Sequence, residues 1–277
     1  MNTYVETSFY LPEISPELKE ILIAELSDIG YESFIEENDE LKCYIPREDF
    51  NSEILYQTLK QLSDQNITYQ VKLIPRENWN QTWEANYEPV LIDDFCYIYA
   101  SFHPQKAYPM QILVEPKMSF GTGHHPTTRL MIRAMRAINF ENKEILDMGC
   151  GTGILSIAAA KLGAKHILGI DIDPWAVENC IENCSLNHLT NISCILGDAK
   201  TIDNHYDIIL ANINRNILFH DMEVYSNHLK TNGYLLLSGF FTEDENLLLN
   251  HSANFSLLFV RKFEEQNWSC MILQKSK

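Results

Sequence analysis

The first 75 residues mix two patterns of apolar and polar positions. Stretches of alternating residues predict strands, and two segments with apolar residues three or four positions apart predict helices. Ser15 and Pro16 are expected to begin the first helix and Gly30 to end it, because these residue types favour those positions. The second helix is expected at 51–62, and strands are expected at 4–11, 31–36, 41–45 and 67–74. This βαββαβ order is typical of a small ferredoxin-like α+β domain over residues 1–75.

From about residue 128, helices and strands are expected to alternate. The apolar spacing predicts helices at 128–138, 154–162, 175–186 and 217–229, and strands at 144–148, 166–170, 192–196, 206–211, 234–238, 255–261 and 268–274. This alternation indicates a mainly parallel, doubly wound α/β sheet of seven strands. We therefore expect a second domain over 91–277, which begins with short strands at 97–100 and 111–114. Residues 76–90, where Trp79 and Trp83 stand among polar residues, are expected to be a linker.

Negative charge is concentrated in the first domain. The 277 residues carry 21 Lys and Arg against 38 Asp and Glu, a net charge of −17. Residues 1–76 hold 6 basic and 15 acidic residues, a net charge of −9. This excess disfavours nucleic-acid binding, which needs a basic stripe to neutralise phosphates. It suits a cationic partner, or a solvated surface that only aids solubility.

Cysteine usage and the N-terminal sequence predict a cytoplasmic protein. The first ten residues lack the basic and apolar regions of a signal peptide, and no apolar run reaches the ~20 residues of a membrane span. Seven cysteines in a chain of this length favour reduced thiols. Cys180 and Cys184 share a helical face, but no histidine or second cysteine pair completes a zinc set, so no metal is expected.

A glycine-rich segment, Gly149-Cys150-Gly151-Thr152-Gly153, follows a predicted strand and opens a predicted helix. Glycines at such a turn let the backbone approach a ligand closely. A dinucleotide-binding fingerprint would place its third glycine one position later, and no lysine follows as in a phosphate-binding P-loop. Gly149 and Gly151 are therefore candidate contacts for another ligand, although strand-to-helix packing alone also explains such a turn.

Polar residues end the strands that follow. Asp171 stands 22 residues after Gly149, where a carboxylate can accept both ribose hydroxyls of an adenosine, whereas Asp173 is expected to cap the next helix. Asp198 either accepts an adenine amino group or only forms a turn after a glycine. Asn212 ends a strand at the edge where open α/β sheets bind ligands, although an asparagine there is often only a turn residue.

These segments resemble known enzymes. Residues 145–156, 169–173 and 207–212 are similar to the class I S-adenosylmethionine-dependent methyltransferases. The segment Phe120 to Thr128, with the sequence FGTGHHPTT, closely resembles the ribosomal protein L11 methyltransferase family. The tryptophan-containing segment 78–83 and the small N-terminal domain also fit that family, so the resemblance covers nearly the whole chain.

The resemblance implies an enzyme that uses S-adenosylmethionine to methylate ribosomal protein L11 at its N-terminal α-amine and at lysine ε-amines. It implies that the N-terminal domain captures this protein. The side-chain carbonyl of Asn212, or a nearby backbone carbonyl, is expected to orient the amine, and we assign no general base. The resemblance implies cofactor contacts from Thr128, Gly149, Asp171 and Asn212. The glycine turn and the strand ends add Gly151 and Asp198 as candidate contacts.

Other functions stay open on the sequence alone. The same motifs would serve a class I methyltransferase that acts on another protein, a small molecule or RNA. RNA is disfavoured, because adenine amino-methyltransferases usually carry Asn-Pro-Pro-aromatic where this chain has Asn212-Ile213-Asn214-Arg215. A regulatory protein that binds the cofactor without catalysis also fits these motifs.

Overall fold

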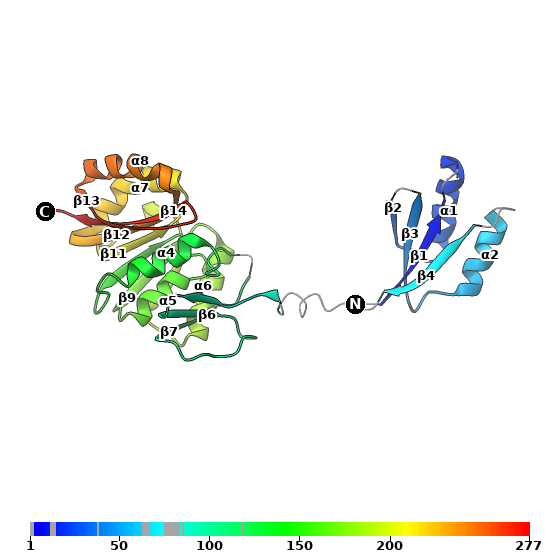
Figure 1. Ribbon diagram of the computed structural model, residues 1–277, viewed down its shortest axis with the longest axis horizontal. Helices are drawn as coiled ribbons and strands as arrows, with labels where there is room; N and C mark the ends of the chain where they lie inside the picture. The colour runs from blue at the N-terminus through cyan, green and yellow to red at the C-terminus, as the bar shows by residue number, and fades with distance from the viewer. Residues whose placement is uncertain are drawn as a thin grey trace. The chain divides into compact units, whose positions relative to one another are not determined.

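The computed structural model describes residues 3–11, 15–37, 39–62, 67–74, 84, 86–117 and 119–277. The chain divides into two compact units, 1–86 and 87–277, and each is described by itself (Figure 1). Most of the linker expected at 76–90 lies outside the described residues. Among the described residues, no helix is both long enough and apolar enough to cross a membrane.

The N-terminal unit has the predicted βαββαβ order. Its elements are β1 (Tyr4–Tyr10), α1 (Pro16–Asp28), β2 (Ser33–Glu37), β3 (Glu40–Pro46), α2 (Ser52–Leu62) and β4 (Tyr69–Ile74). The strands form an antiparallel sheet in the order β2-β3-β1-β4. Both helices pack against one face of this sheet, around a core that includes Phe9, Leu22 and Leu55. The ferredoxin-like fold expected from the sequence is confirmed.

The ends of α1 follow from local chemistry. The Ser15 hydroxyl accepts the Leu18 N–H at 3.2 Å, which satisfies one of the free donors of the first turn. Pro16 occupies the first turn, and Gly30 follows the helix with a φ of +100°, a conformation that glycine adopts without strain. Both predicted helix ends are therefore confirmed.

The C-terminal unit contains two sheets. The smaller one has the order β5-β6-β7 and consists of β5 (Val90–Ile92), β6 (Cys96–Tyr99) and β7 (Met110–Leu113). The elements of the larger sheet and its helices are α4 (Pro126–Met135), β8 (Glu144–Met148), α5 (Ile154–Lys161), β9 (His166–Asp171), α6 (Pro174–Leu186), β10 (Ile192–Leu196), β11 (Tyr206–Asn212), α7 (Arg215–His228), β12 (Leu229–Phe241), α8 (Glu245–Ser252), β13 (Leu257–Glu265) and β14 (Trp268–Lys275).

The larger sheet has seven strands in the order β10-β9-β8-β11-β12-β14-β13. The first five run parallel, and β14 pairs antiparallel with both β12 and β13. Helices α4, α5 and α6 pack on one face and α7 and α8 on the other, so neighbouring residues of β8 such as Ile145 and Leu146 enter different cores. The doubly wound, mainly parallel α/β sheet expected from the sequence is confirmed.

Two elements were not predicted, and one helix begins earlier than expected. β5 begins at Val90, the last residue of the expected linker, and its three residues are too few to show a period. α8 contains three consecutive leucines, of which only Leu248 is buried, so its apolar face is not visible as a helical repeat. The helix expected at 128–138 begins two residues earlier, at Pro126, because His125 caps it: its ring Nδ1 accepts the Thr127 N–H.

Candidate active site

A cavity of about 540 Å³ opens at the carboxyl ends of the central strands. β8 lies between β9 and β11 in the sheet, and the chain leaves these strands toward opposite faces, which is where open α/β sheets bind ligands. The volume is in the range of small-molecule sites. The cavity brings together five of the six residues predicted from the sequence: Gly149, Gly151, Asp171, Asp198 and Asn212.

The glycine turn after β8 forms the floor of this cavity. The N–H groups of Gly149 and Cys150 both donate to the Ile170 carbonyl, at 2.8 and 3.1 Å, which ties the turn to β9. Gly151 has a φ of +53°, and a Cβ there would lie 2.3 Å from the Phe120 carbonyl oxygen. A side chain at position 151 would therefore push the turn away from its neighbours.

The segment that carries FGTGHHPTT is joined to this turn. The Thr152 N–H donates to the Phe120 carbonyl at 3.0 Å, and the Thr152 hydroxyl donates to the Gly121 carbonyl at 2.6 Å. His124 lies outside the cavity lining, where its Nε2 contacts the Glu88 carbonyl at 2.8 Å. Two motifs about 30 residues apart in sequence thus form one structural unit.

Asp171 is held at the end of β9 by two backbone donors. Its Oδ2 accepts the Gly151 N–H at 2.9 Å, and its Oδ1 accepts the Asp173 N–H at 3.0 Å. A carboxylate oxygen has two lone pairs, so each oxygen can accept one more donor from the cavity. Asp173 accepts the Trp175 N–H at 2.9 Å and caps α6, as predicted.

Asp198 also has a local role. Its Oδ1 accepts the Lys200 N–H at 2.9 Å and caps a short 3₁₀ turn at Ala199–Thr201. The turn interpretation is thus confirmed. Asp198 also lines the cavity, so recognition of an adenine amino group stays a prediction.

Asn212 ends β11 and lines the cavity. Its Oδ1 atom is buried and accepts no hydrogen bond from the described residues. A buried carbonyl oxygen without a donor costs about 1–3 kcal/mol. This unpaired acceptor is available to a hydrogen-bond donor from a ligand.

Thr128 is placed differently from the other predicted contacts. It is fully buried in α4 and does not line the cavity, whereas its neighbour Thr127 does. The helix begins at Pro126, so successive side chains point in directions about 100° apart and only one of the two threonines faces the cavity. The Thr128 hydroxyl is buried without a hydrogen-bond partner among the described residues, and its contact with the cofactor stays a prediction.

An aromatic wall, absent from the predicted site list, borders the cavity. We use this name for Phe120, His125 and Trp268, which line the cavity; Phe241 packs against Trp268. The His125 ring lies 5.4 Å from that of Phe120 and 4.7 Å from that of Trp268, and Phe241 lies 4.1 Å from Trp268. Burial and then the Arg129 guanidinium lower the pKa of His125, so this ring is neutral at neutral pH. No local motif surrounds Trp268, which reaches the wall because β14 pairs with β12.

Asp147 lies beneath the site, fully buried in β8. The Ser156 hydroxyl donates to its Oδ2 at 2.6 Å, and its Oδ1 has no partner among the described residues. Burial raises the pKa of Asp147 from 3.8 to about 7. Between these two pH values the folded protein binds one more proton than the unfolded chain. The free energy of unfolding therefore falls as the pH rises from about 4 to about 7.

We expect Asp147→Asn to remove this pH dependence. Relative to the variant, the free energy of unfolding of the wild type should fall by about 1.4 kcal/mol per pH unit between about pH 5 and 7 and then level off. Chemical denaturation of both proteins across this range measures the difference. Parallel pH profiles would contradict a titrating Asp147.

Comparisons with known proteins identify the family. A family model described as ribosomal protein L11 methyltransferase (PrmA) matches residues 15–276. The chain is 38% identical to the ribosomal protein L11 methyltransferase of Porphyromonas gingivalis, over 97% of this chain and 96% of that protein. It is 36% identical to the one of Chlorobaculum tepidum, over 99% and 97%.

A solved structure agrees with these sequence matches. The crystal structure of ribosomal protein L11 methylase from Lactobacillus delbrueckii subsp. bulgaricus superposes with a TM-score of 0.64 and 26% identity, over 69% of this chain and all of that one. The enzyme class expected from the sequence, a protein methyltransferase that uses S-adenosylmethionine, is confirmed. The chain belongs to the ribosomal protein L11 methyltransferase family.

Proposed function

We propose that this protein transfers methyl groups from S-adenosylmethionine to the N-terminal α-amine and to lysine ε-amines of ribosomal protein L11. The observation that carries the proposal is the cavity that brings Asn212, whose buried Oδ1 is unpaired among the described residues, together with the glycine turn and Asp171. Membership of the family supports L11 as the substrate. Since that substrate is a ribosomal protein, the cytoplasm is the expected place of action.

The residues around the cavity suit this cofactor. The Asp171 carboxylate can accept both ribose hydroxyls, and the 73% exposed side chain of Ile172 offers an apolar surface beside it for the adenine ring. Asp198 lies on the same cavity and can accept the adenine amino group. When bound, S-adenosylmethionine supplies a methyl group on a positively charged sulfur, and this sulfur is the leaving group when an uncharged amine nitrogen takes the methyl group.

The amine side of the cavity is formed by Asn212 and the aromatic wall. The Asn212 Oδ1 atom can accept an N–H from the substrate amine and so direct the nitrogen lone pair, and such positioning supplies a large part of many rate accelerations. The faces of Phe120 and Trp268 attract cations. They suit an ammonium group that gains methyl groups and can no longer donate hydrogen bonds.

The amine must lose its proton before it reacts. At pH 7 this costs about 4–5 kcal/mol for a free lysine and about 1 kcal/mol for an α-amine, so the α-amine is the easier acceptor. His125 is neutral, but its Nδ1 already accepts the Thr127 N–H at 3.3 Å. We therefore assign no general base and propose that the amine is deprotonated as it leaves water for the cavity, because desolvation lowers an amine pKa.

The N-terminal unit is proposed to capture the ribosomal protein. Its described surface is dominated by exposed carboxylates: Glu17, Glu20, Glu25, Asp28, Glu32, Glu36, Glu37, Asp39, Glu40, Glu48, Asp49 and Glu53. Lys19 and Lys42 neutralise only Glu36 and Glu37. The remaining carboxylates suit a cationic partner, and ribosomal proteins are typically cationic.

We expect the KM for L11 to rise several-fold as the ionic strength increases from low to high, because salt screens attraction between exposed charges. The KM for S-adenosylmethionine, which binds in the cavity, should stay nearly constant and serves as the internal control. Steady-state kinetics over a salt series measure both values. A KM for L11 that does not change with salt would limit the acidic surface to a role in solubility.

The acceptor is tested with S-adenosylmethionine that carries a labelled methyl group. The protein is incubated in parallel with purified L11, with ribosomal RNA and with small amines. Label in L11 alone supports the proposal. Label in RNA or in small amines, with L11 unlabelled, would identify the labelled molecule as the substrate instead of L11. Binding of the cofactor without transfer to any acceptor would favour a regulatory protein.

A further inference from the structure

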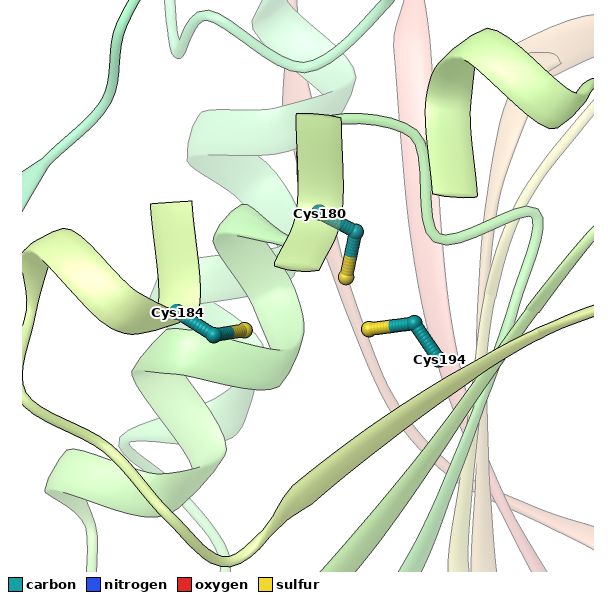
Figure 2. A group of neighbouring side chains, drawn as sticks. All are labelled: Cys180, Cys184 and Cys194. Atoms are coloured by element: carbon teal, nitrogen blue, oxygen red, sulfur yellow. The ribbon is translucent and has the colours of Figure 1, made fainter. Parts of the chain in front are cut away.

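A group of cysteines lies behind the glycine turn. Cys180 and Cys184 are one turn apart in α6, and the sheet places Cys194 of β10 opposite them. The Sγ atoms of these three residues all lie within 4.8 Å of one another. Figure 2 shows the three sulfurs turned toward one shared space. The partner that the sequence left missing for the helical pair is supplied by a neighbouring strand.

A fourth thiol borders this group. Cys150 stands in the glycine turn, and a Cβ placed on Gly169 would lie 3.2 Å from the Cys150 Sγ and 3.6 Å from the Cys194 Sγ. The sulfurs of Cys150 and Cys194 therefore both pack against Gly169 of β9. Cys150, Cys180 and Cys184 are buried, and Cys194 is half-buried.

An ion can reach the group from the surface. A hollow of about 480 Å³ is lined by Cys184, Cys194 and His188 among others. Two of the three cysteines therefore border solvent-accessible space. An entry path and a sufficient set of ligands are both requirements of a protein metal site.

The spacing of the sulfurs suits a small thiophilic ion. Tetrahedral zinc–thiolate sites have Zn–S distances of about 2.3 Å, which sets neighbouring sulfurs about 3.8 Å apart. Sulfurs within 4.8 Å of one another need to move together by about 1 Å or less to reach this geometry. Sulfur ligands select Zn²⁺ or Cu⁺ over Mg²⁺ or Ca²⁺, which prefer oxygen.

We propose that Cys180, Cys184 and Cys194 form a site for a thiophilic closed-shell cation, with Zn²⁺ as the reference ion and with the neighbouring thiol of Cys150 available as the fourth ligand. The ion joins α6 to β10 directly behind the turn that carries Gly149 and Gly151. Its role is structural: each thiol that binds releases its proton to solvent, and the ion holds the back of the cofactor cavity together.

The site is tested by titrating the reduced, full-length protein with Cd²⁺, which gives an ultraviolet charge-transfer band when thiolates bind it. The wild type should show a band that saturates at one equivalent and that is reversed by competing Zn²⁺. Zn²⁺ should also raise the Tm, since an ion that binds only the folded state stabilises it. Cys194→Ala should lose the saturable band.

Cys270→Ala is the control, because Cys270 is a buried free cysteine that lies outside the group and contacts Met131. This variant should keep the band. If Cys194→Ala does not fold cooperatively, Cys184→Ala takes its place and should also lose the band. No saturable band in the wild type, or an undiminished band in a folded Cys194→Ala or Cys184→Ala, would overturn the proposal.

Discussion

Asp171→Ala is expected to weaken S-adenosylmethionine binding by at least 100-fold. The Asp171 carboxylate is already oriented by the N–H groups of Gly151 and Asp173, so it would accept the ribose hydroxyls of the proposed cofactor without first losing side-chain freedom. Hydrogen bonds to a charged group contribute about 1.5–3 kcal/mol each, and two of them correspond to more than 100-fold in affinity. Isothermal titration calorimetry with the cofactor measures the loss.

Asp173→Ala is the matched control for this experiment. Asp173 is two residues away and also borders the cavity, but its carboxylate caps α6. Its removal should cost about 1 kcal/mol of stability and change the cofactor affinity by less than about threefold. Affinity in Asp171→Ala within a few-fold of the wild type, or an equal loss in both variants, would contradict ribose recognition by Asp171.

Asn212→Ala is expected to lower kcat for L11 by about 100- to 1000-fold, the usual effect of removing one group that acts on the reacting atoms. Asn212 lines the cavity, and its buried Oδ1 atom has no partner among the described residues. Because most of the proposed cofactor contacts lie on Asp171, Asp198 and the glycine turn, cofactor affinity should fall by less than about tenfold. Single-turnover rates with saturating substrates separate the two effects.

Asn214→Ala serves as the comparison, since Asn214 also borders the cavity but caps α7 by accepting the Ile217 N–H at 3.2 Å. It should lose stability while kcat stays within a few-fold of the wild type. An Asn212→Ala enzyme with normal kcat would remove the amine-orienting role and leave Asn212 as a residue that only ends its strand.

Features decided by neighbouring residues in the chain were predictable. Ser15 and Asp173 cap helices because their side chains reach N–H groups two or three residues away. The glycine turn and Asp171 stand at the ends of two neighbouring parallel strands, so their meeting at one edge of the sheet followed from the alternation of helices and strands.

Features decided by long-range pairing were not predictable from local patterns. Trp268 joins the aromatic wall because β14 pairs with β12, where it stands opposite Phe241. Cys194 meets Cys180 and Cys184 because β10 packs beneath α6. Thr128 shows a second limit of prediction from sequence. Helix α4 begins two residues earlier than expected, and its first residue decides which of two adjacent threonines faces the cavity.

The proposed reaction is tested most directly by the mass spectrum of L11 after incubation with this protein and S-adenosylmethionine. Added methyl groups are expected on the N-terminal α-amine and on lysine side chains, and they should be nearly absent with Asn212→Ala at the same cofactor saturation. Unmodified L11 in the presence of wild-type protein that binds the cofactor would contradict the proposed reaction.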